Sequence, residues 1–485
     1  MLHEYTDIAV IGGGISGLSA AHRLATLARA PTTGEEPRIT LLEADERLGG
    51  KLRTERIAGR PLDVGAEALL ARVPGAIELC RELGLEDELV APLTDQAYIW
   101  TDALHPLPPR LLAGLPGGAG RMISSRILSP AGLARAALDL IAPSRGIEAD
   151  ISIGSLVRRR LGDQALERLI DPLLGGIHAG NCDQLSVQST APQLAAAVAT
   201  GRGLVRGLRL AAPKPSGGPP PPMFLTLRGG LGRLVEALRA QLEGVECLTG
   251  SRVAELQALG GGAWRLRLED GSTLEAAQVI LAVPAYAAAE LLGEAAPAAA
   301  GELARVEYAS VATVSLSYPA GALAAAPAGS GFLVQRGRER TMTACTLSSN
   351  KWPHLAGRTA LLKCSVGCAG ERSALELDDQ ALLARVRAEL REVLGIEGPA
   401  ESAAVHRFER ALPQYTVGHA ARIRRVESEL ARLPGLRLCG AAYHGVGVPA
   451  CIRDGQGAAA AAWAELPIGG RPERLSGSRP AHLSN

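Results

Sequence analysis

Residues 7–17 read DIAVIGGGISG, an apolar run that leads into glycines with the spacing G-x-G-x-x-G. The apolar run predicts a short buried strand of a parallel sheet. Gly12 permits the tight turn after it, Gly14 lets a pyrophosphate approach the backbone, and Gly17 lets the following helix pack closely on the strand. The N–H groups and the dipole at the start of that helix would hold the phosphates. The stretch therefore predicts a βαβ unit that binds a dinucleotide.

The residues that follow support this prediction. Apolar side chains at positions 15, 18, 21 and 24 recur with helical spacing, and Ile39–Leu42 predicts a second buried strand. Glu43 ends that strand 26 residues after Gly17, where a carboxylate would accept hydrogen bonds from ribose hydroxyls. This spacing is a little long, and the turn-rich insertion 30–37 accounts for the excess. A glycine-rich turn beside a surface glutamate is the alternative, which the strand and helix context disfavours.

The composition limits the partners and the compartment of this 485-residue chain. Hydrophobic residues make up 47%, enough for a large core, and the net charge of +1 argues against nucleic acid as a partner. The eight cysteines include no CxxC pair and no arrangement that completes a metal site. With no secretion signal at the N-terminus, we expect reduced thiols, no bound metal and a cytoplasmic location. The longest charge-free stretch, 309–335, contains prolines and glycines and predicts strands and turns, not a membrane helix.

The rest of the chain alternates between α/β and helical character. Residues 264–268 and 273–274 flank Asp270-Gly271, which is a hairpin signal. Residues 100–222 read mostly as helices interrupted by Pro and Gly clusters. A second substantial sheet and a following helix are predicted by apolar patterns at 311–318, 331–335, 341–347, 359–366 and 378–394.

The residues after Glu43 distinguish FAD from NAD. Residues 43–51 read EADERLGGK, and this E-A-x-x-R-x-G-G pattern resembles the extended FAD signature of the amine-oxidase-like flavoproteins, in which the Gly-Gly backbone passes close to the cofactor. Residues 63–67, DVGAE, resemble the D-x-G-A segment that lies by the flavin ring in that superfamily. Nicotinamide-dependent dehydrogenases lack these two segments after the first βαβ unit, so the resemblance implies FAD.

Three later motifs narrow the resemblance to one family. Residues 439–452, CGAAYHGVGVPACI, resemble a Y-x-G-V-x-x-x-x-C-I motif, and residues 412–419, LPQYTVGH, resemble P-Q-Y-x-x-G-H. Residues 176–186, GIHAGNCDQLS, resemble G-[IV]-x-A-G-[ND]-x-x-x-L-S. All three are motifs of the porphyrinogen oxidases, flavoproteins that dehydrogenate protoporphyrinogen IX or coproporphyrinogen III. The resemblance extends from Ile8 to Ala464, almost the whole chain.

The resemblance implies an α/β fold with three domains. These are a Rossmann-type FAD-binding domain of the amine-oxidase-like flavoprotein fold, a mixed-sheet substrate domain and a helical domain. The FAD-binding domain would be discontinuous, because the matching segments are far apart in the chain. The implied ranges are 1–75, 224–295 and 405–466 for the FAD-binding domain, 76–95 and 296–404 for the substrate domain, 96–212 for the helical domain, 213–223 for a Pro/Gly-rich loop and 467–485 for a flexible tail.

The resemblance also implies which residues contact FAD and substrate. The positions implied for FAD are Gly12, Gly13, Gly14, Ile15, Ser16, Gly17, Glu43, Ala44, Gly50, Lys51, Gly65, Ala66, Glu67, Ala68, Val253, Val446, Gly447 and Val448. The positions implied to face the substrate are Gly176, Ser330, Gly331 and Leu333.

We expect the flavin to carry out the oxidation, and no side chain is identified as a catalytic acid or base. A porphyrinogen is a flexible apolar tetrapyrrole with carboxylates, so it needs a broad slot in which the protein orients it. The expected route is hydride transfer from a bridging carbon to the flavin, which O2 reoxidises to give H2O2. His178, His419 and His444 are candidates for a base, although a structural role is favoured for each.

Two positions favour coproporphyrinogen III as substrate, with protoporphyrinogen IX as the alternative. The protoporphyrinogen branch carries a bulky aromatic residue where Ser330 stands and an arginine where Glu67 stands. A smaller side chain leaves room for four propionates in place of two. The arginines that could meet these propionates are Arg72, Arg110, Arg121 and Arg336.

The expected partners are a porphyrinogen, O2 and a ferrochelatase that receives the product, with at most peripheral contact to a membrane. Two other functions remain open at this point. One is a flavin amine oxidase or carotenoid desaturase, which the motifs at 176–186 and 439–452 disfavour. The other is a non-enzymatic flavin-binding protein in a haem-biosynthesis assembly.

Overall fold

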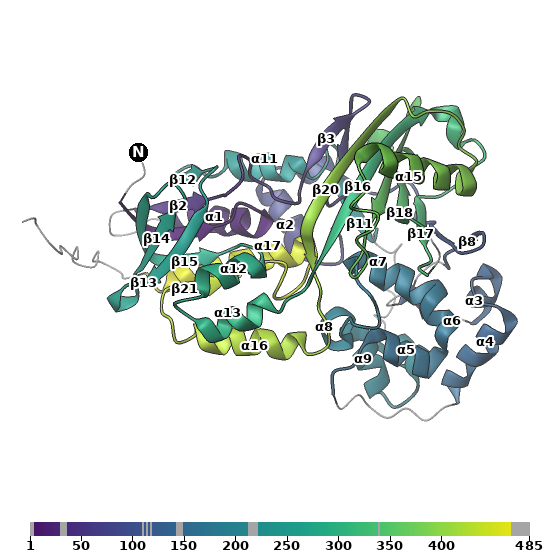
Figure 1. The fold of residues 1–485 in the computed structure, drawn as a ribbon, viewed down its shortest axis with the longest axis horizontal. Helices are drawn as coiled ribbons and strands as arrows, with labels where there is room; N and C mark the ends of the chain where they lie inside the picture. Colours follow the sequence, from purple (N-terminus) through teal and green to yellow (C-terminus); the bar gives the residue numbers. More distant parts are fainter. Residues whose placement is uncertain are drawn as a thin grey trace, which may run out of the picture.

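The computed structural model describes residues 4–29, 36–108, 111–112, 115–116, 119–141, 149–211, 222–337 and 340–466. Two large sheets and a helical lobe make up the molecule (Figure 1). In this view the first sheet lies at the left, the second sheet at the upper right and the helical lobe below the second sheet at the lower right.

The first sheet has seven strands in the order β12-β2-β1-β15-β14-β13, with β21 paired to β15. β1, β2, β12, β15 and β21 run parallel, and β13 and β14 add an antiparallel edge. The hairpin predicted around Asp270-Gly271 joins β14 to β15, and β15 continues beyond the predicted residues 273–274 to Leu281. The strand bounds are Tyr5–Ile11 (β1), Ile39–Leu42 (β2), Val245–Leu248 (β12), Val253–Ala258 (β13), Trp264–Leu268 (β14), Thr273–Leu281 (β15) and Leu436–Leu438 (β21).

Helices cover both faces of this sheet because its central strands are apolar on both sides. On one face, Ile8, Val10 and Ile280 pack in one core with α1 (Ile15–Ala28), α2 (Pro74–Glu82), α11 (Gly232–Ala240) and α17 (Val448–Ala464). On the other face, Ile11 and Val279 pack with α12 (Ala285–Leu292), α13 (Pro297–Ala304) and α16 (His419–Leu430). The first and last helices therefore share one core.

Glycines let α17 cross α1 at short range. A Cβ added at Gly455 would lie 2.1 Å from the carbonyl oxygen of Ser16, and one added at Gly17 would lie 1.8 Å from that of Gly12. No side chain fits at either place, so the glycines determine how closely α1 approaches both its own strand and α17.

The second sheet is mixed and has the order β20-β16-β19-β18-β17-β7-β8, in which only β17 and β7 are parallel. α15 (Asp379–Leu394) packs on its core through Leu382, Val386 and Leu390. The predicted strands and helix are all present. The bounds are Tyr98–Trp100 (β7), Leu104–Pro106 (β8), Tyr308–Pro319 (β16), Gly331–Val334 (β17), Met342–Leu347 (β18), Thr359–Val366 (β19) and Ser402–Pro413 (β20).

Short strands and helices complete the molecule. The strands are Thr54–Ile57 (β3), Arg60–Asp63 (β4), Leu69–Leu70 (β5), Leu89–Val90 (β6), Leu111–Leu112 (β9), Leu115–Pro116 (β10) and Phe224–Leu227 (β11). The helical lobe contains Ala119–Ser125 (α3), Pro130–Ala137 (α4), Ile153–Leu161 (α5), Asp163–Ala165 (α6), Gly176–His178 (α7), Val187–Thr190 (α8), Pro192–Ala199 (α9) and Leu204–Ala211 (α10). A π-helix, η3 (Leu166–Gly175), leads into α7, and α14 (Ser348–Lys351) follows β18.

The structure differs from the predicted domain boundaries in three places. Residues 76–82 of α2 pack in the core of the first sheet and not in the substrate domain, because Leu79 and Cys80 face α17 and its neighbours. Residues 98–106 form β7 and β8 of the second sheet, although they were predicted in the helical domain. The boundary predicted at 405 falls inside β20, which pairs with β16 along its length.

Two predicted segments lie outside the described residues. Of the Pro/Gly-rich loop 213–223 only 222 and 223 are described, and none of the tail 467–485 is. The charge-free stretch 309–335 contains β16 and β17, as expected for strands. Within the described part of the chain, no helix is long and apolar enough to cross a membrane.

Two glycines of α17 test the close helix crossing. We expect Gly455→Ala to lower the thermal unfolding temperature, because the added methyl group clashes with Ser16 and overpacking costs about 1–3 kcal/mol. Gly457→Ala is the matched control. Its Cβ would meet no described atom within 4 Å, and alanine favours a helix over glycine by about 1 kcal/mol. An unchanged or higher unfolding temperature for Gly455→Ala would contradict the crossing.

Candidate functional site

The start of α1 combines crowded glycines with one open position. Gly12 has φ +106°, and a Cβ there would lie 2.7 Å from the carbonyl oxygen of Ala282. A Cβ at Gly14 would meet no described atom within 4 Å. Gly14 is also the N-cap of α1, and no side chain of the described residues caps this helix. The open position and the uncapped N–H groups fit a phosphate group.

The start of α17 has the same character. Gly447 is its N-cap, and again no described side chain caps it. Some described helices do have such caps, for example Ser152 on α5 and Asp378 on α15, whereas others, such as α2 and α12, begin without one. Since α17 crosses α1 at Gly455, two uncapped N-termini with positive dipole ends lie in one region. This region suits an anionic dinucleotide.

Glu43 is held at the end of β2, beside the glycine loop. One carboxylate oxygen accepts a hydrogen bond from Gly13 N at 2.6 Å and the other from Asp45 N at 2.8 Å. Gly49 N donates to Gly13 O at 2.8 Å, and a Cβ at Gly50 would lie 3.3 Å from Gly14 Cα. The structure thus brings together the predicted pyrophosphate and ribose positions.

Lys51 lies near both helix starts. Burial among protein atoms lowers the pKa of its ammonium, and the neighbouring Cys451 partly offsets this. The side chain still has exposed surface. Burial raises the pKa of the Cys451 thiol to about 11, so this cysteine stays a neutral thiol. Lys51 is therefore a positive side chain close to Cys451 of α17, in the region of the two helix starts.

The segment Asp63–Glu67 lies against the backbone of Lys51. Ala66 N donates to Lys51 O at 3.2 Å, and a Cβ at Gly65 would lie 2.0 Å from the same oxygen. The carboxylate of Glu67 turns toward the second sheet, where it pairs with two lysines. Burial alone would raise the pKa of Glu67, but the charges of these lysines outweigh it and hold the pKa well below the usual range.

A network of hydrogen bonds holds the loop before α17. The Tyr415 hydroxyl donates to Ala441 O at 2.7 Å and accepts from Gly445 N at 2.8 Å. Asp454 on α17 accepts from Gly440 N at 2.7 Å. Gly440 and Gly445 have φ +140° and +135°, which other residues rarely adopt. The predicted positions Val446–Val448 are thereby held at the start of α17.

Gly176 and Leu333 meet where the helical lobe joins the second sheet. A Cβ at Gly176 would lie 3.8 Å from Leu333 Cδ2, in ordinary contact. Gly176 directly follows the π-helix, and Ala179 behind it has φ +43°, a strained value for alanine. π-Helices and strained residues concentrate at functional sites.

Ser330 and Gly331 make other contacts. The Ser330 hydroxyl donates to Gln96 O at 3.0 Å. A Cβ at Gly331 would lie 2.1 Å from Cys345 O, so this glycine is needed for β17 to approach β18. Of the four predicted substrate positions, the structure therefore brings together Gly176 and Leu333.

Comparison with known proteins identifies the family. Residues 15–462 match the family of flavin containing amine oxidoreductases. The chain is 38% identical over 459 residues to the coproporphyrinogen III oxidase of Bacillus subtilis, covering 93% of this chain and 96% of that one. It is 33% identical to the protoporphyrinogen oxidase of Bos taurus, covering 93% and 97%.

The chain is a flavin-containing oxidoreductase of the porphyrinogen oxidase family. A solved structure from Exiguobacterium sp. 255-15, a protoporphyrinogen oxidase candidate, superposes with a TM-score of 0.83 at 35% identity, covering 95% of this chain and 99% of that one. A putrescine oxidase shares the fold with a TM-score of 0.66 at 16% identity, covering 95% and 99%. The predicted fold class, the oxidoreductase activity and FAD as the cofactor are confirmed.

Two of the three candidate histidines of this porphyrinogen oxidase family member are poorly suited to act as a base. Burial lowers the pKa of His178 and of His419 to about 4, so both are weak proton acceptors. His419 stacks on Tyr415 with the ring centres 4.0 Å apart. His444 bridges Asp454 and Glu427, and the hydrogen bond with Asp454 raises its pKa.

The arginines predicted to meet propionates differ in their surroundings. Arg336 pairs with Asp171 of the π-helix at 3.3 Å. Arg72 is exposed. Arg110 lies outside the described residues, and so does the side chain of Arg121, although its backbone is part of α3.

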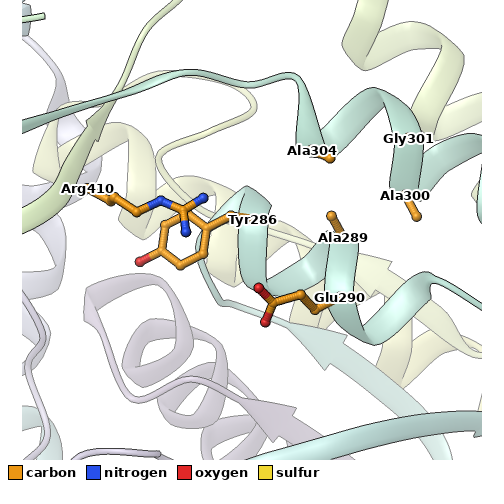
Figure 2. Close-up of a pocket in the computed structure, with 7 residues that line it drawn as sticks. All are labelled: Tyr286, Ala289, Glu290, Ala300, Gly301, Ala304 and Arg410. Atoms are coloured by element: carbon orange, nitrogen blue, oxygen red, sulfur yellow. The ribbon is translucent and has the colours of Figure 1, made fainter.

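A pocket of about 350 Å³ lies between α12, α13 and β20 (Figure 2). None of the residues predicted for FAD or substrate lines it. Arg410 stacks over the Tyr286 ring with its guanidinium carbon 3.6 Å from the ring centre, and its own φ is +44°. Tyr286 contacts Tyr308 of β16 edge-on at 5.1 Å. These contacts join α12 to the second sheet.

Sequence reasoning missed Lys351, Lys363 and Tyr415 as residues that hold the site. Tyr415 stood within a recognised motif but received no role. The signal for the two lysines was their rarity, since only four of the 51 basic residues are lysines. Among the described residues no cluster of His, Cys, Asp or Glu could hold a metal ion.

We expect Gly14→Val to fold normally and to lose FAD. The added side chain meets no described protein atom within 4 Å of its Cβ, so it projects into the open space where we expect the pyrophosphate. The ratio of flavin absorbance to protein absorbance after purification measures retention, and thermal unfolding of the apoprotein checks the fold. A folded variant that purifies with a full complement of flavin would show that Gly14 does not face the cofactor.

Proposed function

We propose that this protein oxidises coproporphyrinogen III to coproporphyrin III, with FAD as the electron acceptor, in haem biosynthesis. The observation that carries the proposal is the 38% identity to the Bacillus subtilis coproporphyrinogen III oxidase over 96% of that protein. The bovine protoporphyrinogen oxidase is less similar, at 33%. Oxidation of protoporphyrinogen IX is the second candidate.

The geometry supports a flavin-centred reaction. FAD supplies the two-electron acceptor, and three rounds of dehydrogenation convert a porphyrinogen to a porphyrin. The chain's own residues would bind and orient the reactants. Glu43 and the loop Gly12–Gly17 would hold the ADP part of FAD, and the network of Tyr415 and Asp454 would fix the backbone of Val446–Val448 beside the flavin. Gly176 and Leu333 would contact the tetrapyrrole.

The proposal includes a cellular setting. O2 would reoxidise the flavin and yield H2O2, and a ferrochelatase would accept the product. The weakly basic His178 and His419 support proton loss from the pyrrole nitrogens to a backbone carbonyl or to water. We place the protein in the cytoplasm, since its cysteines are all free thiols in the described residues.

Side-by-side turnover of two substrates tests the proposal. The FAD-loaded protein is mixed aerobically with coproporphyrinogen III or with protoporphyrinogen IX, and porphyrin fluorescence is followed after subtraction of spontaneous oxidation. We expect a higher kcat/KM for coproporphyrinogen III. The reverse preference would assign the chain to the second candidate, and turnover of neither would contradict both.

Ser330→Phe tests whether slot width selects the substrate. The aromatic ring replaces a half-buried serine and removes its hydrogen bond to Gln96. We expect kcat/KM for coproporphyrinogen III to fall about tenfold further than for protoporphyrinogen IX, as for a change of about 1.4 kcal/mol in differential binding. Ser330→Ala removes the same hydrogen bond without adding bulk and serves as the control. Equal losses with both substrates would refute selection by slot width.

A further inference from the structure

A buried group of four charges links the two sheets at the segment Asp63–Glu67. The side chains of Glu67, Lys351 and Lys363 are 14%, 18% and 7% exposed. Lys351 Nζ lies 2.7 Å from one Glu67 oxygen and Lys363 Nζ lies 2.8 Å from the other. The fourth member is Asp63, whose carboxylate accepts a hydrogen bond from Leu231 N at 2.9 Å. Asp63 ends β4, Glu67 lies between β4 and β5, Lys351 ends α14 and Lys363 lies in β19.

The ammonium group of Lys363 has three hydrogen-bond acceptors. Its ammonium donates to Asp63 O at 3.0 Å and to Gly65 O at 3.2 Å, besides the Glu67 carboxylate. An ammonium has three protons, and each has an acceptor here. Thr313 of β16 adds a hydrogen bond to Val64 O at 2.8 Å. The second sheet thus binds consecutive carbonyl groups of 63–65.

Lysine is rare in this chain, so its presence at both positions that form ion pairs with Glu67 points to a specific requirement for an ammonium group. Of its 51 basic residues only four are lysines, and two of those four meet at Glu67. A planar guanidinium directs its N–H groups in a fixed fork, whereas an ammonium is a compact donor with three diverging protons. The three acceptors of Lys363 therefore suit lysine and not arginine.

The charges balance at neutral pH. The lysines hold Glu67 ionised, since its pKa lies well below the usual range. Burial raises the pKa of Asp63 to about 6, so Asp63 is mostly ionised at pH 7.5. Two carboxylates and two ammonium groups then sum to zero. Loss of one lysine leaves a net negative charge in a poorly solvated place, where it acts strongly on nearby groups.

We propose that Lys363 is a positioning residue that balances the charge of the segment Asp63–Glu67 and thereby sets how readily the bound flavin accepts electrons. The inference rests on the proposed contact of Gly65–Ala68 with the flavin. Reduced flavin carries additional negative charge, so an uncompensated carboxylate close to the ring disfavours reduction. Lys363 acts through the segment that it holds and has no role in the chemistry itself.

The reduction potential of the flavin tests this role. We expect Lys363→Met to retain FAD, because the phosphate-binding helix starts are built from other residues, and to lower the equilibrium constant for two-electron reduction at least tenfold. This corresponds to about 30 mV at pH 7.5 for a two-electron couple. Lys351→Met removes the same charge but leaves the hydrogen bonds of Lys363 intact, so we expect a shift in the same direction. Lys351→Met also serves as the test variant if Lys363→Met does not fold.

Two further variants separate charge from general damage. Glu67→Gln combined with Lys363→Met restores the balance between Asp63 and Lys351, and most of the lost potential should return. Arg160→Met breaks a buried ion pair with Asp139 in the helical lobe and should destabilise the fold without moving the potential. A flavin-loaded Lys363→Met or Lys351→Met protein whose equilibrium constant stays within threefold of the wild type would overturn the inference. A double variant shifted as far as Lys363→Met would overturn it as well.

The same experiment distinguishes failure of this inference from failure of the proposed function. A wild-type protein that holds no flavin would refute the proposed FAD site. A wild-type protein that holds flavin and oxidises coproporphyrinogen III, with an unshifted potential in either flavin-loaded single-lysine variant, would refute only the role of Lys363.

Discussion

The close crossing of α1 and α17 is the constraint on which the arrangement of the candidate site depends. At Gly455 the two helices approach so closely that a methyl group cannot fit, and Gly17 brings α1 equally close to its own strand. Both helices begin without a side-chain cap from the described residues, so their N–H groups and dipoles are directed to one region. Helix starts of this kind can accept an anion, and the candidate site therefore draws on segments from both ends of the chain.

The arrangement of the candidate site also depends on the contact between the two sheets. This contact includes the charged group at Glu67 and the stacking of Arg410 on Tyr286, and is not made by apolar side chains alone. Buried charges are costly unless they are fully paired, and here each Glu67 oxygen has its own lysine. Such a group tolerates little displacement, because a small shift would leave a charge unpaired. It therefore specifies the relative position of the flavin-side segment and the substrate-side sheet more sharply than packing alone.

Local patterns predicted most of the fold, and long-range contacts account for what they missed. The unit from β1 to β2 and the strands β16 to β19 follow from apolar periodicity and glycine spacing within short windows. The boundaries near α2 and β7 were wrong because the partners of those elements are α17 and β17, hundreds of residues away, and no local pattern shows them. At the site, Glu43 and the glycines were predictable from motifs. Lys363 was visible only as a lysine inside an apolar strand.

Glu67 shows why residue identity at one position is an incomplete guide to substrate choice. A glutamate at this position, taken alone, suggests a negatively charged surface. In the structure, two lysines already compensate that carboxylate. Arg336 is likewise engaged by Asp171. Arg72, by contrast, is exposed. The charge that a substrate experiences is a property of the paired group and not of the single residue.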